Sequence, residues 1–154
     1  MSSEFHQTRG HLTAVNLFSS LHGVWDRDNP IGSHIYGHTN LTETKLAFDL
    51  FWRSNVPAKK LNMGLGFYGR SFQLQDPKCN KPGCIFKGGA AKGGCSGESG
   101  ILTYREIQQI IRRDKLKPFH DKKAGVKYIT YQTDQWVSFV STQPSGAAHI
   151  DVFG

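Results

Sequence analysis

The sequence predicts an α/β fold with an inserted α+β subdomain. The first half shows a strand pattern, a helix pattern and a second strand pattern, whereas the second half has a Gly- and Cys-rich stretch, one short helix pattern and two strand patterns. With 154 residues the chain can bury a hydrophobic core. It is too short for a complete (β/α)8 barrel, which needs about 250 residues.

The elements of the first half follow from apolar spacing. The apolar run in Leu12–Leu21 has the length of a buried strand. Helical spacing follows over Asn40–Ser54, with Glu43 three positions after Asn40 as in a capping box and a proline soon after the end. Apolar and small residues alternate over Leu61–Tyr68 and predict a closely packed strand. Asn40 also begins an N-glycosylation sequon, so helix cap and glycan site remain alternative uses.

The second half predicts a loop, a helix and a pair of strands. Gln73–Gly100 is rich in Gly, Pro, Cys and Lys without periodicity, which is typical of a loop. Thr103 and Glu106 have capping-box spacing before three isoleucines at helical positions. Val126–Tyr131 and Gln135–Val140 are separated by three turn-forming residues and predict a β-hairpin or two neighbouring strands.

The positive charge is spread along the chain. There are 19 Lys and Arg residues against 12 Asp and Glu, a net charge of +7. The basic residues fall in short runs near predicted helix ends and turns, which is typical of a solvated surface. These runs are Lys59-Lys60, Arg112-Arg113 with Lys115 and Lys117, and Lys122-Lys123. Nucleic acid is therefore not the expected partner.

The three cysteines all lie in the Gly-rich stretch. Cys79, Cys84 and Cys95 are separated by four and ten residues, which does not match the ligand spacing of a zinc site. We expect no metal, and instead one disulfide with one remaining thiol, as suits a secreted protein. The sequence leaves the pairing open.

Membrane and targeting segments are not expected in this chain. No stretch approaches the roughly 18 apolar residues of a membrane span. Residues 1–11 are mostly polar and lack the pattern of a signal peptide.

Three residues are candidates for binding a ligand. Trp25 follows the end of the first predicted strand, where its ring could stack on a sugar, although a core position is the alternative. Tyr68 and Arg70 lie two apart at a strand end, so both can point toward the hydroxyl or carbonyl groups of a ligand. The alternative is that they only close the rim of the strand.

A series of motifs then points to a family. In chain order they are LHGVWD, IYGHTNLTETKLAFDLFWRSNVPAKKLNMGLGFYGRSFQL, DPKC, PGC, GGA, GILTYREI and VKYITYQTDQWVSF. Their order and spacing resemble those of fungal chitinases of glycoside hydrolase family 18, over about residues 15 to 139. The resemblance implies a partial (β/α)8 TIM barrel, with about strands six and seven.

In the terms of that family, Val15–Leu21 resembles the sixth barrel strand, Asn40–Ser54 the sixth helix and Leu61–Arg70 the seventh strand. The implied domains are a partial barrel segment at 12–72 and, at 73–139, the chitinase insertion subdomain that walls one side of the substrate groove. Residues 1–11 are expected to be unrelated or disordered, and residues 140–154 a disordered tail.

The resemblance implies hydrolysis of β-1,4-linked N-acetylglucosamine polymers without a cofactor. In the family the acetamido oxygen of the sugar attacks the anomeric carbon, while a Glu protonates the leaving oxygen. That Glu ends a D-x-x-D-x-D-x-E motif, which does not occur in this sequence. A second family motif, M-x-Y-D, aligns with Leu17-Phe18-Ser19-Ser20, so its Tyr and Asp are replaced. We therefore assign no catalytic residue and expect the chain to be inactive by itself.

The resemblance implies that the chain retains residues that contact chitin or chitooligosaccharide. Trp25, Tyr68 and Arg70 match substrate-contact positions of the family, whereas Trp136 is expected to pack in the subdomain. An extracellular location is implied by the family. Three hypotheses remain open: a chitinase-family hydrolase, a chitin-binding lectin module, and a remnant without function.

Overall fold

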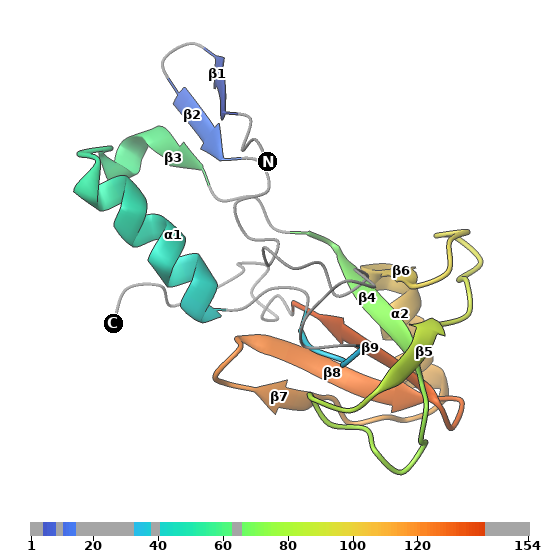
Figure 1. Ribbon diagram of the computed structural model, residues 1–154. Helices are drawn as coiled ribbons and strands as arrows, with labels where there is room; N and C mark the ends of the chain where they lie inside the picture. Colours follow the sequence, from blue (N-terminus) through green and yellow to red (C-terminus); the bar gives the residue numbers. More distant parts are fainter. Residues whose placement is uncertain (1–4, 9–10, 15–32, 38–40, 63–65, 141–154) are drawn as a thin grey trace.

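The computed structural model of the chain describes residues 5–8, 11–14, 33–37, 41–62 and 66–140 (Figure 1). A small sheet lies beside helix α1, and a larger sheet carries helix α2. In chain order the elements are β1 (Phe5–Thr8), β2 (His11–Ala14), α1 (Leu41–Arg53), the 3-10 helix η1 (Ala58–Lys60), β3 (Leu61–Asn62), β4 (Tyr68–Leu74), β5 (Phe86–Gly89), β6 (Ile101–Thr103), α2 (Tyr104–Arg113), β7 (Phe119–Asp121), β8 (Val126–Tyr131) and β9 (Gln135–Phe139).

The small sheet contains the predicted strand, helix and strand. β2 pairs in parallel with β3, and α1 connects them, so the three form a β-α-β unit. The helix lies within one residue of its predicted bounds at each end. β2 covers the beginning of the apolar run predicted as the first strand, and residues 15–32 lie outside the described residues. β1 falls in the segment expected to be unrelated or disordered, yet it forms a strand because it pairs antiparallel with β2.

The larger sheet is antiparallel throughout. Its strand order is β5-β4-β9-β8-β7, and β6 pairs with the beginning of β4. The predicted hairpin is confirmed as β8 and β9. Its turn contains Gln132 and Thr133 with φ of 46° and 72°, the left-handed region that reverses the chain tightly.

Two predicted bounds are wrong, those of one strand and of one loop. The single strand predicted over Leu61–Tyr68 is divided, because β3 belongs to the small sheet while β4 begins at Tyr68 and pairs with β9 in the larger one. The predicted loop Gln73–Gly100 contains the end of β4 and all of β5, which pairs with β4 despite its glycines. Alternation along one strand does not reveal a change of pairing partner, which depends on residues distant in sequence.

Each face of the larger sheet carries its own hydrophobic cluster. The cluster on one face comprises Ile35, Phe72, Leu74, Cys84, Phe86, Tyr128 and Trp136. The cluster on the other face lies under α2 and comprises Leu102, Ile107, Ile129, Tyr131, Val137 and Phe139. The alternation of side chains along the strands distributes residues between these two cores.

Helix α2 begins as the sequence predicts. The Thr103 hydroxyl accepts from the Glu106 N–H at 3.3 Å, and the Glu106 carboxylate accepts from the Thr103 N–H at 2.8 Å. This is a complete capping box. Ile107 is fully buried against the sheet, while Arg112 and Arg113 end the helix in solvent. The predicted helix, with its capping box and its apolar side, is confirmed.

The disulfide joins Cys79 to Cys84, and Cys95 is free and exposed. This resolves the pairing that the sequence left open. Next to the disulfide, the segment 33–36 runs alongside β5: the Ile35 N–H donates to the Cys84 carbonyl and the Phe86 N–H to the Ser33 carbonyl, both at 2.8 Å. The disulfide loop therefore borders an additional backbone segment at this edge of the larger sheet.

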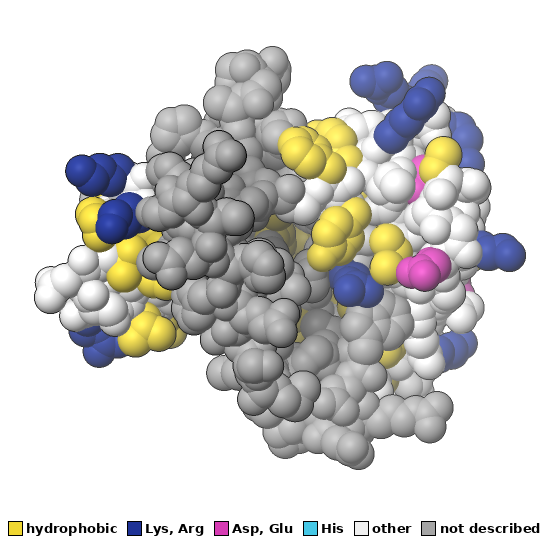
Figure 2. Space-filling view, turned by 90° about the horizontal axis from the view of Figure 1, so that it is seen from above, with side chains coloured by type: hydrophobic (Ala, Val, Ile, Leu, Met, Phe, Trp, Pro, Cys, Tyr) yellow, Lys and Arg dark blue, Asp and Glu magenta, His cyan; other side chains and the backbone are white. Residues whose placement is uncertain are grey.

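The basic runs are exposed to solvent, as predicted. On the face seen in Figure 2, Lys and Arg side chains stand at several separate places around the molecule. This agrees with a solvated distribution of the charge.

Candidate substrate-binding site

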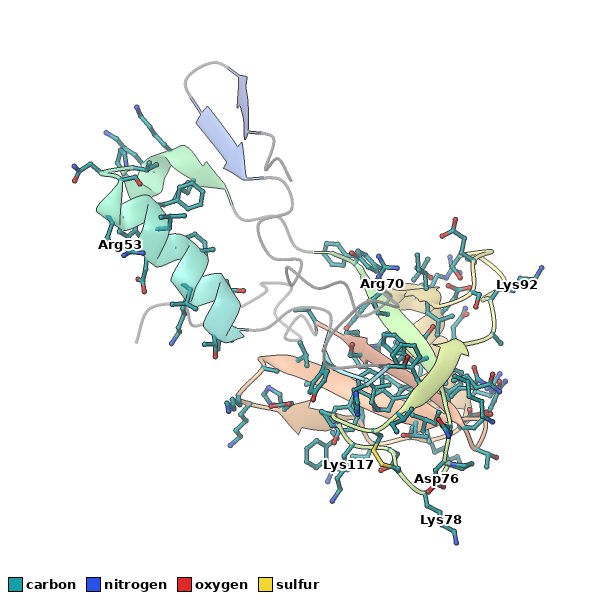
Figure 3. All side chains as sticks on the ribbon, viewed as in Figure 1. Arg53, Arg70, Asp76, Lys78, Lys92 and Lys117 are labelled. Atoms are coloured by element: carbon teal, nitrogen blue, oxygen red, sulfur yellow. A yellow bond between two sulfur atoms is a disulfide. The ribbon has the colours of Figure 1, made fainter. Side chains whose placement is uncertain are left out.

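Tyr68 and Arg70 lie together at the beginning of β4, where β6 pairs with it. Figure 3 labels Arg70 on this strand. The two residues are two positions apart on one strand, so their side chains share a face of the sheet. The Arg70 Cζ lies 5.8 Å from the centre of the Tyr68 ring, within the range of a cation–π contact. Both side chains are half-buried. The pair thus presents an aromatic ring and a guanidinium group side by side.

Two glycines make this arrangement possible. A Cβ on Gly69 would lie 2.5 Å from the Ser138 carbonyl oxygen and 2.8 Å from Cδ1 of Ile107, so β4 can approach β9 and α2 closely only with glycine at this position. A Cβ on Gly66 would lie 2.7 Å from Cε1 of Tyr68, so the Tyr68 ring rests against the bare backbone. In the pattern G-x-Y-G-R, the Tyr68 ring thus lies close to both Gly66 and the Arg70 guanidinium.

A row of side chains crosses the sheet from this pair. Arg70 is opposite Ser138, Ser138 is opposite Tyr128, and Tyr128 is opposite Phe119, so all four point to one face. The Phe119 ring lies 5.0 Å from the Tyr128 ring and is 60% exposed. No sequence pattern singles out Phe119, because β7 has only three residues and no alternation.

A second exposed aromatic residue directly precedes the pair. Phe67 is 66% exposed, its ring contacts Tyr104 edge to face at 6.4 Å, and its carbonyl accepts from the Tyr104 N–H at 2.9 Å. The sequence placed Phe67 within a strand of alternating apolar residues, which concealed its exposure. Its contact with Tyr104, the first residue of α2, places this ring on the α2 side, whereas Tyr68 and Arg70 point to the other face of the sheet.

The other residues singled out from the sequence fall into two groups. Trp136 is fully buried, 6.0 Å from Phe72 and 5.4 Å from Tyr128 between ring centres, so the prediction that it packs in the core is confirmed. Trp25, Asn40 and the segment Leu17-Phe18-Ser19-Ser20 lie outside the described residues.

The buried Glu106 is held as an anion. Its carboxylate accepts from the Cys95 N–H at 2.7 Å, the Ser96 N–H at 3.3 Å, and the Thr103 N–H and hydroxyl at 2.8 Å. Burial by itself raises the pKa of Glu106, but these hydrogen bonds, led by the backbone N–H groups of Cys95 and Thr103, lower it from 4.5 to about 2. A general acid needs a pKa nearer to the working pH. Glu106 therefore fastens the 95–96 loop to α2 and is unsuited to protonating a leaving group.

Within the described part of the chain, no group of three or more His, Cys, Asp or Glu side chains is placed to hold a metal ion. None of the helices in that part of the chain is long and apolar enough to cross a membrane.

The sequence model of the family "Glycosyl hydrolases family 18" matches residues 3–146 of this chain. The chain belongs to glycoside hydrolase family 18. The match extends into both end segments, beyond the region of residues 15 to 139 over which the sequence motifs resemble fungal chitinases.

Relatives within family 18 include chitinases from fungi, plants and insects. The "Secreted chitinase LysM12" of Penicillium expansum is 31% identical over 144 residues, which cover 84% of this chain and 10% of that protein. The "Class V chitinase CHIT5a" of Medicago truncatula is 27% identical and covers 77% of this chain and 29% of that protein. This chain therefore spans less than a third of the length of these relatives.

Solved chitinases share the fold. The Ostrinia furnacalis Group IV chitinase in complex with allosamidin has a TM-score of 0.58 and 29% identity, covering 86% of this chain and 32% of that one. A GH18 chitinase of Cycas revoluta in complex with (GlcNAc)4 has a TM-score of 0.63 and 21% identity, covering 82% of this chain and 34% of that one. These similarities support the predicted α/β class for the whole fold of the family. The described residues contain one β-α-β unit and one antiparallel sheet.

Proposed function

We propose that this chain is a substrate-binding part of a chitin-degrading hydrolase. The observation that carries the proposal is the contact between Tyr68 and Arg70 on β4, half-buried and on one face of the sheet. Family membership supplies the reaction class, because the similar proteins are named as chitinases.

The pair suits an N-acetylated sugar. The Tyr68 ring can stack on the apolar face of a pyranose, while the guanidinium of Arg70 donates hydrogen bonds to hydroxyl or carbonyl oxygens. Gly66 leaves room for the Tyr68 ring in its observed position, and Gly69 lets β4 approach β9 and α2 closely. Trp25, at the position that resembles a family substrate contact, is proposed as a third contact.

The domain division is part of this proposal. Residues 12–72 would supply about strands six and seven of the barrel, and residues 73–139 the insertion subdomain beside the groove. The β-α-β unit and the two-sided core of the larger sheet support these assignments. The boundary falls within β4, so that one strand would connect both parts. Residues 140–154 would lie outside them, whereas β1, in the segment 1–11, pairs with β2 of the barrel segment.

Binding of a chitooligosaccharide by the complete 154-residue chain tests the proposal. Isothermal titration with chitohexaose should detect saturable binding, and Arg70→Ala should weaken it at least about tenfold, because a hydrogen bond to a charged group contributes about 1.5–3 kcal/mol. Arg105→Ala is the matched control, since Arg105 is exposed on α2. Equal affinities of both variants, with unchanged melting temperatures, would contradict the role of Arg70.

A chitin-binding lectin module is the second candidate. The replacement of the Tyr and Asp of M-x-Y-D by Ser19 and Ser20, in a sequence that keeps Tyr68 and Arg70, favours it. Incubation with labelled chitohexaose separates the candidates: a lectin module binds the oligosaccharide and leaves its length unchanged, whereas cleavage would refute inactivity. The disulfide between Cys79 and Cys84 supports an extracellular location for either candidate, because disulfides persist in oxidising compartments.

A further inference from the structure

The disulfide loop, residues 79–84, holds a backbone segment that is distant in sequence. The loop lies between β4 and β5, and the 33–36 segment runs antiparallel to the chain where the loop ends. The Ile35 N–H donates to the Cys84 carbonyl, and the Gly83 N–H donates to the Ile35 carbonyl, both at 2.8 Å. Both backbone groups of Ile35 are thus bonded to the end of the loop that the disulfide closes.

The Ile35 side chain makes this attachment part of the core. Ile35 is fully buried and belongs to the same hydrophobic cluster as Cys84, Phe72 and Trp136. Phe72 follows Arg70 by two positions on β4, so both side chains share a face and the cluster begins beside the candidate substrate-binding site. Docking of the 33–36 segment therefore covers apolar surface next to that site.

The shape of the disulfide loop depends on its covalent closure. Residues 75–81 are all exposed, so no side chain of this stretch anchors the loop in the core. In Figure 3 the disulfide is the yellow bond in the connection that also carries Asp76 and Lys78. Gly83 has a φ of 94°, which is only one of the many conformations open to glycine. Closing so short a loop covalently favours its compact shape by about 10- to 50-fold in the chain-entropy model.

We propose that the disulfide between Cys79 and Cys84 is a redox-sensitive clasp that keeps the 33–36 segment docked on the larger sheet. Cys79 is exposed and Cys84 is buried, so a dithiol reductant attacks the Sγ of Cys79. The Cys84 Sγ leaves as a thiolate and takes up a proton. The second thiol of the reductant then displaces Cys79 from the mixed disulfide, so the dithiol loses two electrons and two protons and the chain gains two thiols. This clasp goes beyond the proposed function and does not rest on it.

The chain that follows the segment is attached independently of the disulfide. The Leu41 N–H donates to the Ala124 carbonyl at 3.0 Å, in the turn between β7 and β8. A Cβ on Gly125 would lie 3.3 Å from the Cβ of Leu41, so the beginning of α1 packs closely against this turn. Reduction is therefore expected to release the 33–36 segment and to leave α1 and the larger sheet in place.

Hydrogen exchange of the ¹⁵N-labelled 154-residue chain tests the inference. Cys79→Ser with Cys95→Ser is compared with Cys95→Ser alone, the matched control that keeps the disulfide and lacks the free thiol. Loss of the disulfide should speed exchange of the Ile35 and Gly83 amides at least about tenfold, while the cross-peaks of β8 and β9 keep their positions. Equal exchange at Ile35 and Gly83 in both variants would overturn the inference. Loss of the β8 and β9 cross-peaks would overturn it too, because the disulfide would then support the whole sheet.

The reverse coupling supplies the second test. If the disulfide favours docking of the segment, docking must favour the disulfide by the same factor. Ile35→Ala should therefore shift the equilibrium with dithiothreitol toward the reduced chain by at least about fivefold, measured by thiol labelling. Ser33→Ala, at an exposed position of the same segment, is the matched control and should leave this equilibrium unchanged. If Ile35→Ala does not fold, Ile35→Val replaces it, with an expected shift of about twofold or more. An unchanged equilibrium in a folded variant would contradict the inference.

Discussion

The larger sheet and helix α1 differ in how completely their apolar side chains are covered. In the larger sheet Phe72 and Trp136 are fully buried on one face, and Ile107 and Val137 on the other. In α1, Phe48 and Phe51 are buried on one side, yet Leu46 is 62% exposed and Leu50 52% exposed. The larger sheet therefore completes its own core, whereas α1 presents a second apolar side to solvent.

This difference agrees with the proposed division into a barrel segment and an insertion subdomain. An antiparallel sheet can have both of its faces covered by one helix and its own connecting loops. A helix of a (β/α)8 barrel stands in a ring of helices, so its flanks pack against helical neighbours as well as the strands. The exposure of Leu46 and Leu50 is consistent with a helix of that kind. Stability should therefore reside mainly in the larger sheet.

The largest effect is expected from Trp136→Ala. The side chain is fully buried between Phe72 and Tyr128, so its removal should lower the free energy of unfolding by about 3–5 kcal/mol. Trp52→Ala, at a half-buried position on α1, should cost less than half as much. Urea unfolding followed by circular dichroism measures both. Equal losses would contradict the view that the larger sheet carries the stability.

The same contrast explains how much of the fold was predictable. Helix α2 and the β8–β9 hairpin follow from local signals, namely the capping box of Thr103 and Glu106 and the turn at Gln132 and Thr133. The pairing of β4 with β9 rather than with the small sheet depends on residues some 65 positions apart (Phe72 and Trp136 are partners), which no local pattern encodes.

The next effect concerns Glu106, which fastens a loop of the larger sheet. Its pKa is lowered from 4.5 to about 2, so its contribution is fully present above the ordinary value and is lost as pH falls through about 2. The shift corresponds to about 3 kcal/mol. Glu106→Gln should therefore destabilise the chain by about 2–3 kcal/mol at pH 7, and the difference from the unmodified chain should shrink between pH 4.5 and 2. Urea midpoints across this range measure it.

Two controls separate the charge of Glu106 from its surroundings. Glu98→Gln changes an exposed glutamate in the preceding loop and should leave the pH profile as it is. Gly93→Ala would place a Cβ against the Glu106 carboxylate, so its stability should resemble that of Glu106→Gln. A Cβ at Gly94 meets nothing within 4 Å, so Gly94→Ala should be as stable as the unmodified chain. A constant difference between Glu106→Gln and the unmodified chain at every pH would show that the carboxylate is not held as described.

The candidate site was predictable where residues are close in sequence. Tyr68 and Arg70 were expected to lie together because they are two apart on a strand, and the structure brings them into contact. Phe119 joins the same face only through the register of four strands, and Ile35 reaches the core of the larger sheet only because the 33–36 segment pairs with the disulfide loop. Such groupings arise from tertiary packing, which leaves no trace in local sequence patterns.

The smallest effect on folding is expected at the exposed side of α1. Leu46→Gln with Leu50→Gln should change the free energy of unfolding by no more than about 1 kcal/mol, because glutamine has a similar helix propensity and both side chains are already in water. Self-association, measured by light scattering, should decrease as the exposed apolar surface is reduced. Phe51→Gln on the buried side of the same helix is the control and should cost at least about 2 kcal/mol. A comparable loss from the leucine pair would mean that this side of α1 is covered within the chain, and the contrast with the larger sheet would then disappear.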